Sequence, residues 1–285
     1  MDLSYLHSLI LGAVEGITEF IPVSSTAHLR IVESIMKMKT DDATVTAYTA
    51  IIQVPAILAA LIYFWGKIVR LVVAWFRGVR DPEARKAHDY TLAWAVIVGS
   101  IPIGIVGLAL KGVIEKMSNL WVVSLSLIIF SVVLWLAERR HDQLEAKELQ
   151  RGEGEVTVKD GLVLGLAQCL SPILPGVSRS GATISFGLFQ GLTRVAATEL
   201  SFFLAIPALV AAGGYETYKE RHGLSQLPAG PLILGLVVSF VVAYASIAWL
   251  LRFVSTNSLR SFVTYRVAAG AAIVVALLAG WVSAT

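Results

Sequence analysis

Six apolar runs constrain this chain more than any other feature of its sequence. They lie near residues 46–65, 91–110, 119–137, 196–214, 230–251 and 261–283. Each is about as long as the ~20 apolar residues that a helix needs to cross a bilayer. Because 56% of the residues are apolar, only 15% are charged and the mean hydropathy is +0.74, a soluble helical bundle is a poor alternative. The sequence predicts an all-α polytopic membrane protein.

The charge of the loops predicts how these spans are oriented. The loop at 66–90 holds six Lys or Arg residues and the segment 138–160 holds five, whereas the loops at 111–118 and 215–229 hold two each. By the positive-inside rule, the two basic segments are cytoplasmic, so both chain termini lie on the other side. The sequence KIVRLVVAWF, residues 67–76, is typical of an amphipathic helix at the cytoplasmic interface.

One motif occurs twice in the chain. Residues 9–25 read LILGAVEGITEFIPVSS, and residues 162–178 read LVLGLAQCLSPILPGVS. At an offset of 153, Ser25 matches Ser178, but Glu15 falls on Gln168. The two copies therefore share a framework and differ in their chemistry.

The positions of these copies predict an inverted repeat. Three predicted spans separate them, and an odd number of crossings brings the second copy in from the opposite face of the membrane. Pro22 breaks the segment 5–38, and Pro172 and Pro175 break the segment 160–192, so that neither half of either segment is long enough to span. We predict two re-entrant helix pairs, which are tolerated at depth where they line a cavity, with a site near the midplane between the repeats.

These elements define the predicted domain organisation, an inverted-topology repeat. The first repeat covers residues 1–137, and the second covers residues 158–285. Each repeat consists of one re-entrant pair and three transmembrane helices, and residues 138–157 form a cytoplasmic linker between them.

Glu15 and Glu19 are the predicted metal ligands. Four residues apart, they share one face of a helix. Two carboxylates at this depth repel, and inserting each one costs ~2.5–3.5 kcal/mol. A divalent ion, His28, Arg179 or a shared proton would compensate their charge, and a protonated structural pair is the alternative. Hard oxygen ligands of this kind suit magnesium or calcium.

Residues 175–183, PGVSRSGAT, predict a phosphate site. A glycine turn followed by serines at a helix start offers free backbone N–H groups and the positive end of a helix dipole, and the Arg179 fork matches phosphate oxygens. Residues 22–26, PVSST, are expected to cap the other inward helix in the same way. Plain N-capping, with Arg179 paired to a glutamate, is an alternative that is compatible with binding. The predicted phosphate-binding residues are Ser24, Thr26, Gly176, Ser178, Arg179, Ser180 and Thr183.

His28 follows Ser25 by about one helical turn. It is a candidate base, acid or phosphate ligand, and a purely structural histidine is an equal alternative.

These motifs carry a family resemblance. EGITE at 15–19, PVSSTAH at 22–28 and PGVSRSGAT at 175–183 resemble the bacitracin-resistance type of undecaprenyl-diphosphate phosphatase, and the likeness covers essentially the whole chain. It implies a multi-pass enzyme of the bacterial inner membrane that removes the terminal phosphate from undecaprenyl diphosphate. It also implies recycling of the lipid carrier for cell-wall synthesis, resistance to bacitracin, a divalent-metal requirement and an active site that faces the periplasm. The catalytic residues that the resemblance implies are Glu15, Glu19, Ser25, His28 and Arg179.

Two classes of function fit these residues. In a phosphatase, Ser25 or an activated water attacks the terminal phosphorus, Glu19 or His28 accepts the proton, and Ser178 serves as a cap and phosphate donor. A lipid-phosphate transporter or flippase could use the same inverted-repeat site, but transport alone does not require an acidic pair beside a serine. The expected partners are a polyprenyl diphosphate lipid and membrane lipid, with no nucleic acid; a homodimer is a possible assembly.

Overall fold

The computed structural model describes residues 3–38, 43–109, 119–225 and 227–284. Within these residues, six helical segments are long and apolar enough to cross a membrane, and no β-strand is found. The predicted class, an all-α polytopic membrane protein, is confirmed. The predicted loop at 111–118 lies outside the described residues.

Five of the predicted spans are single helices. They are α6 (His88–Ala109), α8 (Leu120–Glu145), α12 (Arg194–Lys219), α14 (Ala229–Val254) and α15 (Arg260–Leu278). The first span, predicted at 46–65, is instead two helices, α3 (Ala43–Ile51) and α4 (Gln53–Tyr63). Pro55 has no N–H to donate to the carbonyl of Ile51 four residues earlier, which explains the break between them.

The predicted linker, 138–157, starts too early, because α8 continues to Glu145. This charged extension still buries Glu138, His141 and Leu144 at helical spacing. Arg194 of α12 donates hydrogen bonds of 2.8–3.2 Å to the carboxylate of Glu138. Tertiary contacts therefore maintain a helix where the composition predicted a linker. The rest of the segment contains the short 3-10 helix η3 (Glu153–Glu155).

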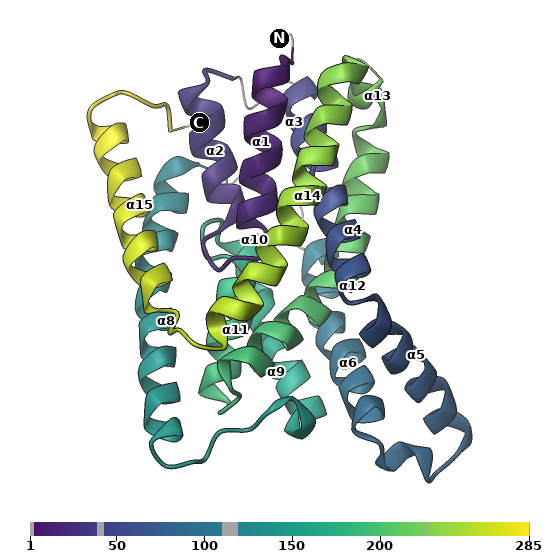
Figure 1. The fold of residues 1–285 in the computed structure, drawn as a ribbon. Helices are drawn as coiled ribbons and strands as arrows, with labels where there is room; N and C mark the ends of the chain where they lie inside the picture. Colours follow the sequence, from purple (N-terminus) through teal and green to yellow (C-terminus); the bar gives the residue numbers. More distant parts are fainter. Residues whose placement is uncertain (1–2, 39–42, 110–118, 226, 285) are drawn as a thin grey trace.

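The predicted amphipathic helix is longer than the segment 67–76 that predicted it. It is α5 (Trp65–Arg80), which exposes Val69, Val72, Val73 and Phe76 and connects through η1 (Ala84–Lys86) to α6. Figure 1 shows α5 slanting away from the bundle beside the start of α6. A short helix, α13 (Arg221–Leu224), lies at the opposite end of the molecule.

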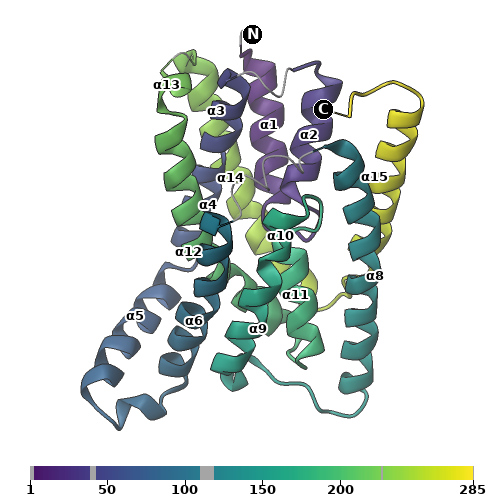
Figure 2. The same ribbon diagram turned by 180° about the vertical axis from the view of Figure 1, so that it is seen from behind.

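The two motif segments are broken helix pairs, as predicted. The first pair is α1 (Tyr5–Thr18) and α2 (Ser25–Ile35); the second is α9 (Val158–Gln168) with the short α10 (Leu170–Ile173) and α11 (Arg179–Phe189). In Figures 1 and 2, the first pair descends from the end that holds both termini, and the second rises from the opposite end. Their turns are in contact, because the Ser180 hydroxyl donates to the carbonyl of Ile21 at 3.2 Å. A symmetry relation between the halves stays a prediction of the sequence.

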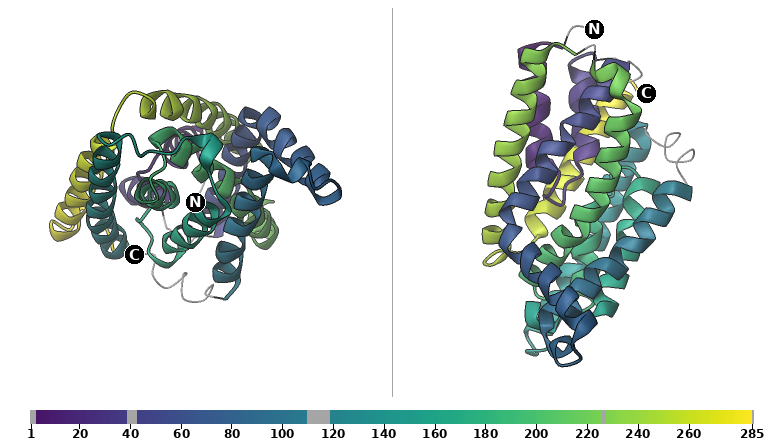
Figure 3. Two further views of the ribbon diagram at one scale, coloured as in Figure 1. Left: turned by 90° about the horizontal axis from the view of Figure 1, so that it is seen from below. Right: turned by 90° about the vertical axis from the view of Figure 1, so that its right-hand side faces the viewer.

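Glycines let the motif helices pack closely on their neighbours. A Cβ on Gly12 of α1 would lie 2.6 Å from the carbonyl oxygen of Gly235 in α14. A Cβ on Gly165 of α9 would lie 2.1 Å from the carbonyl oxygen of Gly99 in α6. Small residues at helix crossings are typical of membrane bundles. Seen from below, α8 and α15 lie on one side of the motif segments and α5 and α6 on the other (Figure 3, left).

Arg151 connects the start of α9 with the end of α11, the two ends of the second motif segment. Both terminal nitrogens of Arg151 donate to Asp160 at 2.8 Å, and Nη2 also donates to the carbonyl of Gln190 at 2.8 Å. Asp160 lies outside the six spans. Burial disfavours its charged carboxylate, but the hydrogen bonds from Arg151 and Thr157 outweigh burial and lower the pKa of Asp160. Both ends of the helix pair are thus fixed at one place.

Candidate active site

A serine with an unusual backbone conformation precedes each inward helix. Ser24 has a φ of 76° and caps α2, and Ser178 has a φ of 71° and caps α11. Their hydroxyl oxygens accept hydrogen bonds from the N–H groups of Ala27 at 3.4 Å and Gly181 at 3.1 Å. The predicted capping is confirmed at both helix starts. Positive φ at a residue other than glycine costs about 1–3 kcal/mol and is often found at functional sites.

The caps correct the predicted register of the repeat. Ser24, not Ser25, is the structural equivalent of Ser178, and Ser25 is equivalent to Arg179, since these are the first residues of α2 and α11. The reason is one extra residue in the second copy. Gly12 and Ser24 are 12 positions apart, whereas Gly165 and Ser178 are 13 apart.

The two helix starts meet at the carboxylate of Glu19. Arg179 Nη2 donates to its Oε1 at 2.6 Å, and the Ser25 hydroxyl donates to its Oε2 at 2.7 Å. The side chains of Glu19 and Arg179 are only 8% and 12% exposed. The structure therefore brings three of the predicted catalytic residues together, with Glu19 placed to accept a proton from Ser25.

Buried polar atoms beside this cluster have no hydrogen-bond partner among the described residues. They are Nη1 of Arg179 and both carboxylate oxygens of Glu15, which is fully buried one helical turn before Glu19. A buried polar group without a partner costs about 1–3 kcal/mol. A phosphate oxygen would satisfy Arg179 Nη1, and a proton or a cation would satisfy Glu15.

The donor set fits a hard divalent cation in chemistry, because Glu15 and Glu19 offer carboxylate oxygens. Both oxygens of Glu19 already accept hydrogen bonds, so the free oxygens belong to Glu15. Elsewhere in the described chain, one group of three acidic or histidine side chains is close enough to hold a metal. It consists of His141, Asp142 and Glu145, but Arg194 and Arg260 already bind Asp142, at 2.9 and 2.5 Å.

A cavity of about 310 Å³ opens at the Glu19 cluster. Its polar lining contains six predicted site residues, Glu19, Ser24, Ser25, Thr26, Ser178 and Arg179. Gln53 of α4 and Ser171 of α10 complete the polar lining, and α6 and α12 add apolar residues such as Ile103 and Leu209.

Three of the predicted phosphate-binding residues do not line this cavity. The Ser180 hydroxyl is held by the Ile21 carbonyl, and the Thr183 hydroxyl lies 2.6 Å from that of Ser201. Gly176 has a φ of 100°, and a Cβ there would lie 2.3 Å from the carbonyl oxygen of Val123. In this structure they support the turn.

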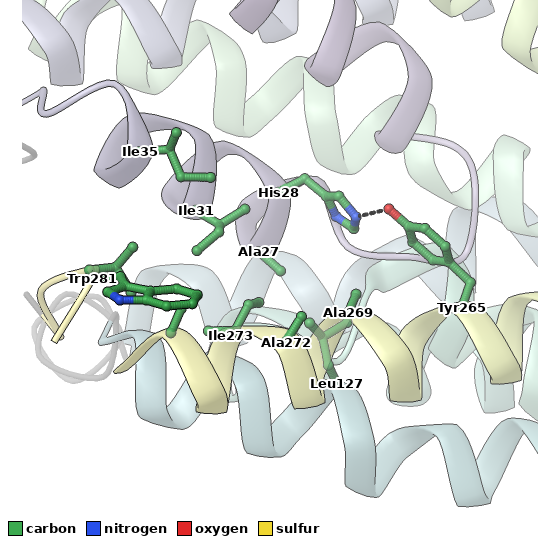
Figure 4. A pocket seen from close by; sticks show the side chains of 12 residues that line it. Ala27, His28, Ile31, Ile35, Leu127, Tyr265, Ala269, Ala272, Ile273 and Trp281 are labelled. Atoms are coloured by element: carbon green, nitrogen blue, oxygen red, sulfur yellow. Dashed lines mark hydrogen bonds between the residues drawn. The ribbon is translucent and has the colours of Figure 1, made fainter. Parts of the chain in front are cut away.

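His28 does not line the cavity at the Glu19 cluster. Its Nδ1 is 2.7 Å from the carbonyl oxygen of Ser24, and its Nε2 is 2.6 Å from the hydroxyl of Tyr265 (Figure 4). A carbonyl only accepts, so Nδ1 carries the proton and Nε2 of the neutral ring accepts from Tyr265. His28 lines a second, mainly apolar cavity of about 540 Å³ between α2, α8 and α15, which ends at Trp281 (Figure 4).

Comparison with known proteins identifies the family of this chain. The family model described as bacitracin resistance protein BacA matches residues 8–272. The chain belongs to this family. Over 99% of its length it is 51% identical to the undecaprenyl-diphosphatase of Cutibacterium acnes, all of which is covered. Over 93% of its length it is 52% identical to undecaprenyl-diphosphatase 1 of Streptomyces coelicolor, of which 92% is covered. The corresponding protein of Micrococcus luteus is 43% identical over 99% of the chain and is covered in full.

Two further residues of this BacA family member were not among the predicted site residues. Gln53 lines the cavity at the Glu19 cluster, and its signal was an amide side chain inside a predicted span. Arg266 is fully buried in α15 against both inward turns. Its signal was a charge inside a predicted span, which is a functional-site hypothesis by default.

Proposed function

We propose that this chain is an integral membrane phosphatase that hydrolyses undecaprenyl diphosphate to undecaprenyl phosphate and inorganic phosphate. The observation that carries the proposal is that Ser25 and Arg179 both donate hydrogen bonds to one buried carboxylate, that of Glu19. Ser25 and Arg179 are the first residues of two capped helices. Relatives of nearly the same length and about half identical in sequence are named undecaprenyl-diphosphatase.

The cavity provides what phosphoryl transfer requires, which is mainly positioning and charge balance. Backbone N–H groups at the starts of α2 and α11 bind oxygens of the terminal phosphate, together with Nη1 of Arg179, which has no hydrogen-bond partner among the described residues. Arg179 Nη2 keeps its bond to Glu19, so that binding of phosphate does not require the ion pair to open.

Ser25, or a water in its place, attacks the terminal phosphorus while Glu19 accepts the proton. The bond between this phosphorus and the bridging oxygen breaks, and the electron pair leaves with undecaprenyl phosphate. If Ser25 attacks, water then hydrolyses the phosphoserine. The 2.7 Å hydrogen bond from Ser25 to Glu19 favours Glu19 over His28 as the acceptor, because the His28 ring is held by Ser24 and Tyr265.

We also propose a requirement for a divalent cation, magnesium or calcium, held by Glu15 and Glu19. A cation bound there would offset the charge of the diphosphate. This part of the proposal is supported by the two partnerless oxygens of Glu15.

The proposed cellular role is recycling of the lipid carrier for cell-wall synthesis, which confers resistance to bacitracin. The proposed location is the bacterial inner membrane, with the cavity accessible from the periplasm. The loop charges support this orientation.

The test is phosphate release from undecaprenyl diphosphate by the purified protein, with and without a chelator. We expect release that falls on chelation and returns with magnesium or calcium. A protein that moves the lipid across vesicle membranes but releases no phosphate would contradict the proposal and support the flippase alternative.

A further inference from the structure

Arg266 of α15 joins the two inward turns. It is the largest side chain that is completely buried among the described residues. Its Nη1 donates to the carbonyl of Pro22 in the first turn at 3.1 Å, and its Nη2 donates to the carbonyl of Gly176 in the second turn at 3.1 Å. One guanidinium therefore fastens the turn of one motif copy to the turn of the other.

The charge of Arg266 has no carboxylate partner among the described residues. Its other hydrogen bonds go to the hydroxyl of Ser131 at 3.3 Å and the carbonyl of Leu127 at 3.4 Å. Its guanidinium carbon also lies 5.8 Å from the centre of the Phe130 ring. Burying a charge without a counter-ion is costly, and charges inside membrane proteins mark functional sites.

This charge lies directly behind the two helix starts. The two carbonyls that Arg266 binds, those of Pro22 and Gly176, each lie three residues before the first residue of the helix that follows, Ser25 in α2 and Arg179 in α11. A Cβ added to Gly181, in the first turn of α11, would lie 3.5 Å from Arg266 Nη1. Arg266 lines neither of the two main cavities, so any effect on a bound phosphate is exerted through the turns and through its charge.

We propose that Arg266 is a positioning residue of the reaction. It holds Ser25 and Arg179 in register by fastening both turns, and it supplies an uncompensated positive charge beneath the bound phosphate. The inference rests on the proposed phosphatase function. Electrostatic interactions are strong in a buried site that excludes water, so a cation there can act without touching the substrate.

The test uses Arg266→Met and Arg266→Lys in the full-length protein, with Arg260→Met as a matched control. Arg260 lies on the same helix but is half exposed and pairs with Asp142. The measurements are kcat, KM and the thermal unfolding midpoint with and without inorganic phosphate. Phosphate should raise the midpoint of the wild-type protein, since a ligand of the folded state stabilises it.

For Arg266→Met we expect kcat/KM to fall on the order of 10- to 100-fold, as for loss of charge-assisted hydrogen bonds, and the phosphate-dependent rise of the midpoint to disappear. Arg266→Lys should keep the phosphate effect but not kcat, because one ammonium is a poor substitute for a fork that binds two carbonyls. Arg260→Met should match the wild-type protein in kcat/KM and in the phosphate effect.

A folded Arg266→Met protein with wild-type kcat/KM would overturn the inference. So would a lower unfolding midpoint with unchanged kcat and an unchanged phosphate effect, because a purely structural residue would behave in that way. If Arg266→Met does not fold, Arg266→Lys decides: wild-type kcat overturns the inference, and reduced kcat with a retained phosphate effect supports it. Failure of the wild-type protein to release phosphate would contradict the proposed function instead.

Discussion

At the scale of single residues, Glu19 accepts two hydrogen bonds from different segments. One comes from Arg179 and orients the guanidinium, and the other comes from Ser25, whose proton Glu19 accepts in the proposed reaction. Charge-assisted hydrogen bonds of this kind are about twice as strong as neutral ones. The three side chains therefore act as a unit, and their substitutions should not be additive.

The first prediction concerns Arg179. Arg179→Ala should lower kcat by on the order of 10³–10⁵, the range for an arginine that stabilises the transition-state charge of phosphoryl transfer. Arg179→Lys should lose most of the activity as well, since an ammonium cannot bind Glu19 and phosphate as a planar fork does. Phosphate release by the lysine variant at the wild-type rate would remove the argument from the fork.

The second prediction separates the two glutamates. Glu19→Gln should lower kcat by on the order of 10²–10⁴ because it removes the proton acceptor. Glu15→Gln should shift the concentration of magnesium or calcium that gives half-maximal activity, because Glu15 is a proposed cation ligand whose oxygens have no hydrogen-bond partner among the described residues. If both variants keep the wild-type cation titration, the metal ligands lie elsewhere.

The third prediction compares the serines of the two turns. Ser25→Ala should lower kcat by at least ~100-fold if the hydroxyl is the nucleophile or positions the attacking water. Ser178→Gly should be mild, because glycine accepts the positive φ and loses only a few tenths of a kcal/mol as a cap. The opposite order of effects in a phosphate-release assay would reject Ser25 as the reacting group.

At the scale of elements, close helix crossings hold the two broken pairs in place. α9 approaches α6 at Gly99, Gly161 and Gly165, where the backbones are nearly in contact. The second turn is attached to α9, so the crossing also sets the position of Arg179.

The fourth prediction tests this crossing with two glycines of the same helix. Gly99→Leu should destabilise the protein by about 1–3 kcal/mol or more, the usual cost of overpacking, because its Cβ would lie 2.3 Å from the Gly161 carbonyl. Gly107→Leu is the control, since no atom lies within 4 Å of the added Cβ. Thermal unfolding in detergent measures the difference, and equal midpoints would show that the crossing does not limit stability.

At the scale of the whole molecule, the basic segments and the termini lie at opposite ends. The exit of α5 and the end of α8 are at one end, and α13 and both termini are at the other (Figure 1). The positive-inside rule predicts that the first end is cytoplasmic.

The fifth prediction tests this orientation in a Cys169→Ser background. An impermeant thiol reagent should label His222→Cys in intact spheroplasts and should not label Asp81→Cys or Glu145→Cys. Labelling of Asp81→Cys and Glu145→Cys without labelling of His222→Cys would put the site on the cytoplasmic face, where it would act on newly made carrier.

The sequence by itself determined the membrane class, the spans and the two broken motif segments, because apolar length, prolines and loop charge are local signals. It also named Glu19, Ser25 and Arg179 as candidate site residues, and the structure brings these three side chains together. Only the tertiary structure decided which groups meet. Because the second turn has one extra residue, Ser25 and Arg179 are the equivalent first residues of α2 and α11. A hydrogen bond between side chains 237 positions apart orients the His28 ring toward Tyr265. A charge inside a predicted span marked Arg266 as unusual, but its partners Pro22 and Gly176 lie in two segments far from it in the chain, so only the tertiary structure showed which groups it binds.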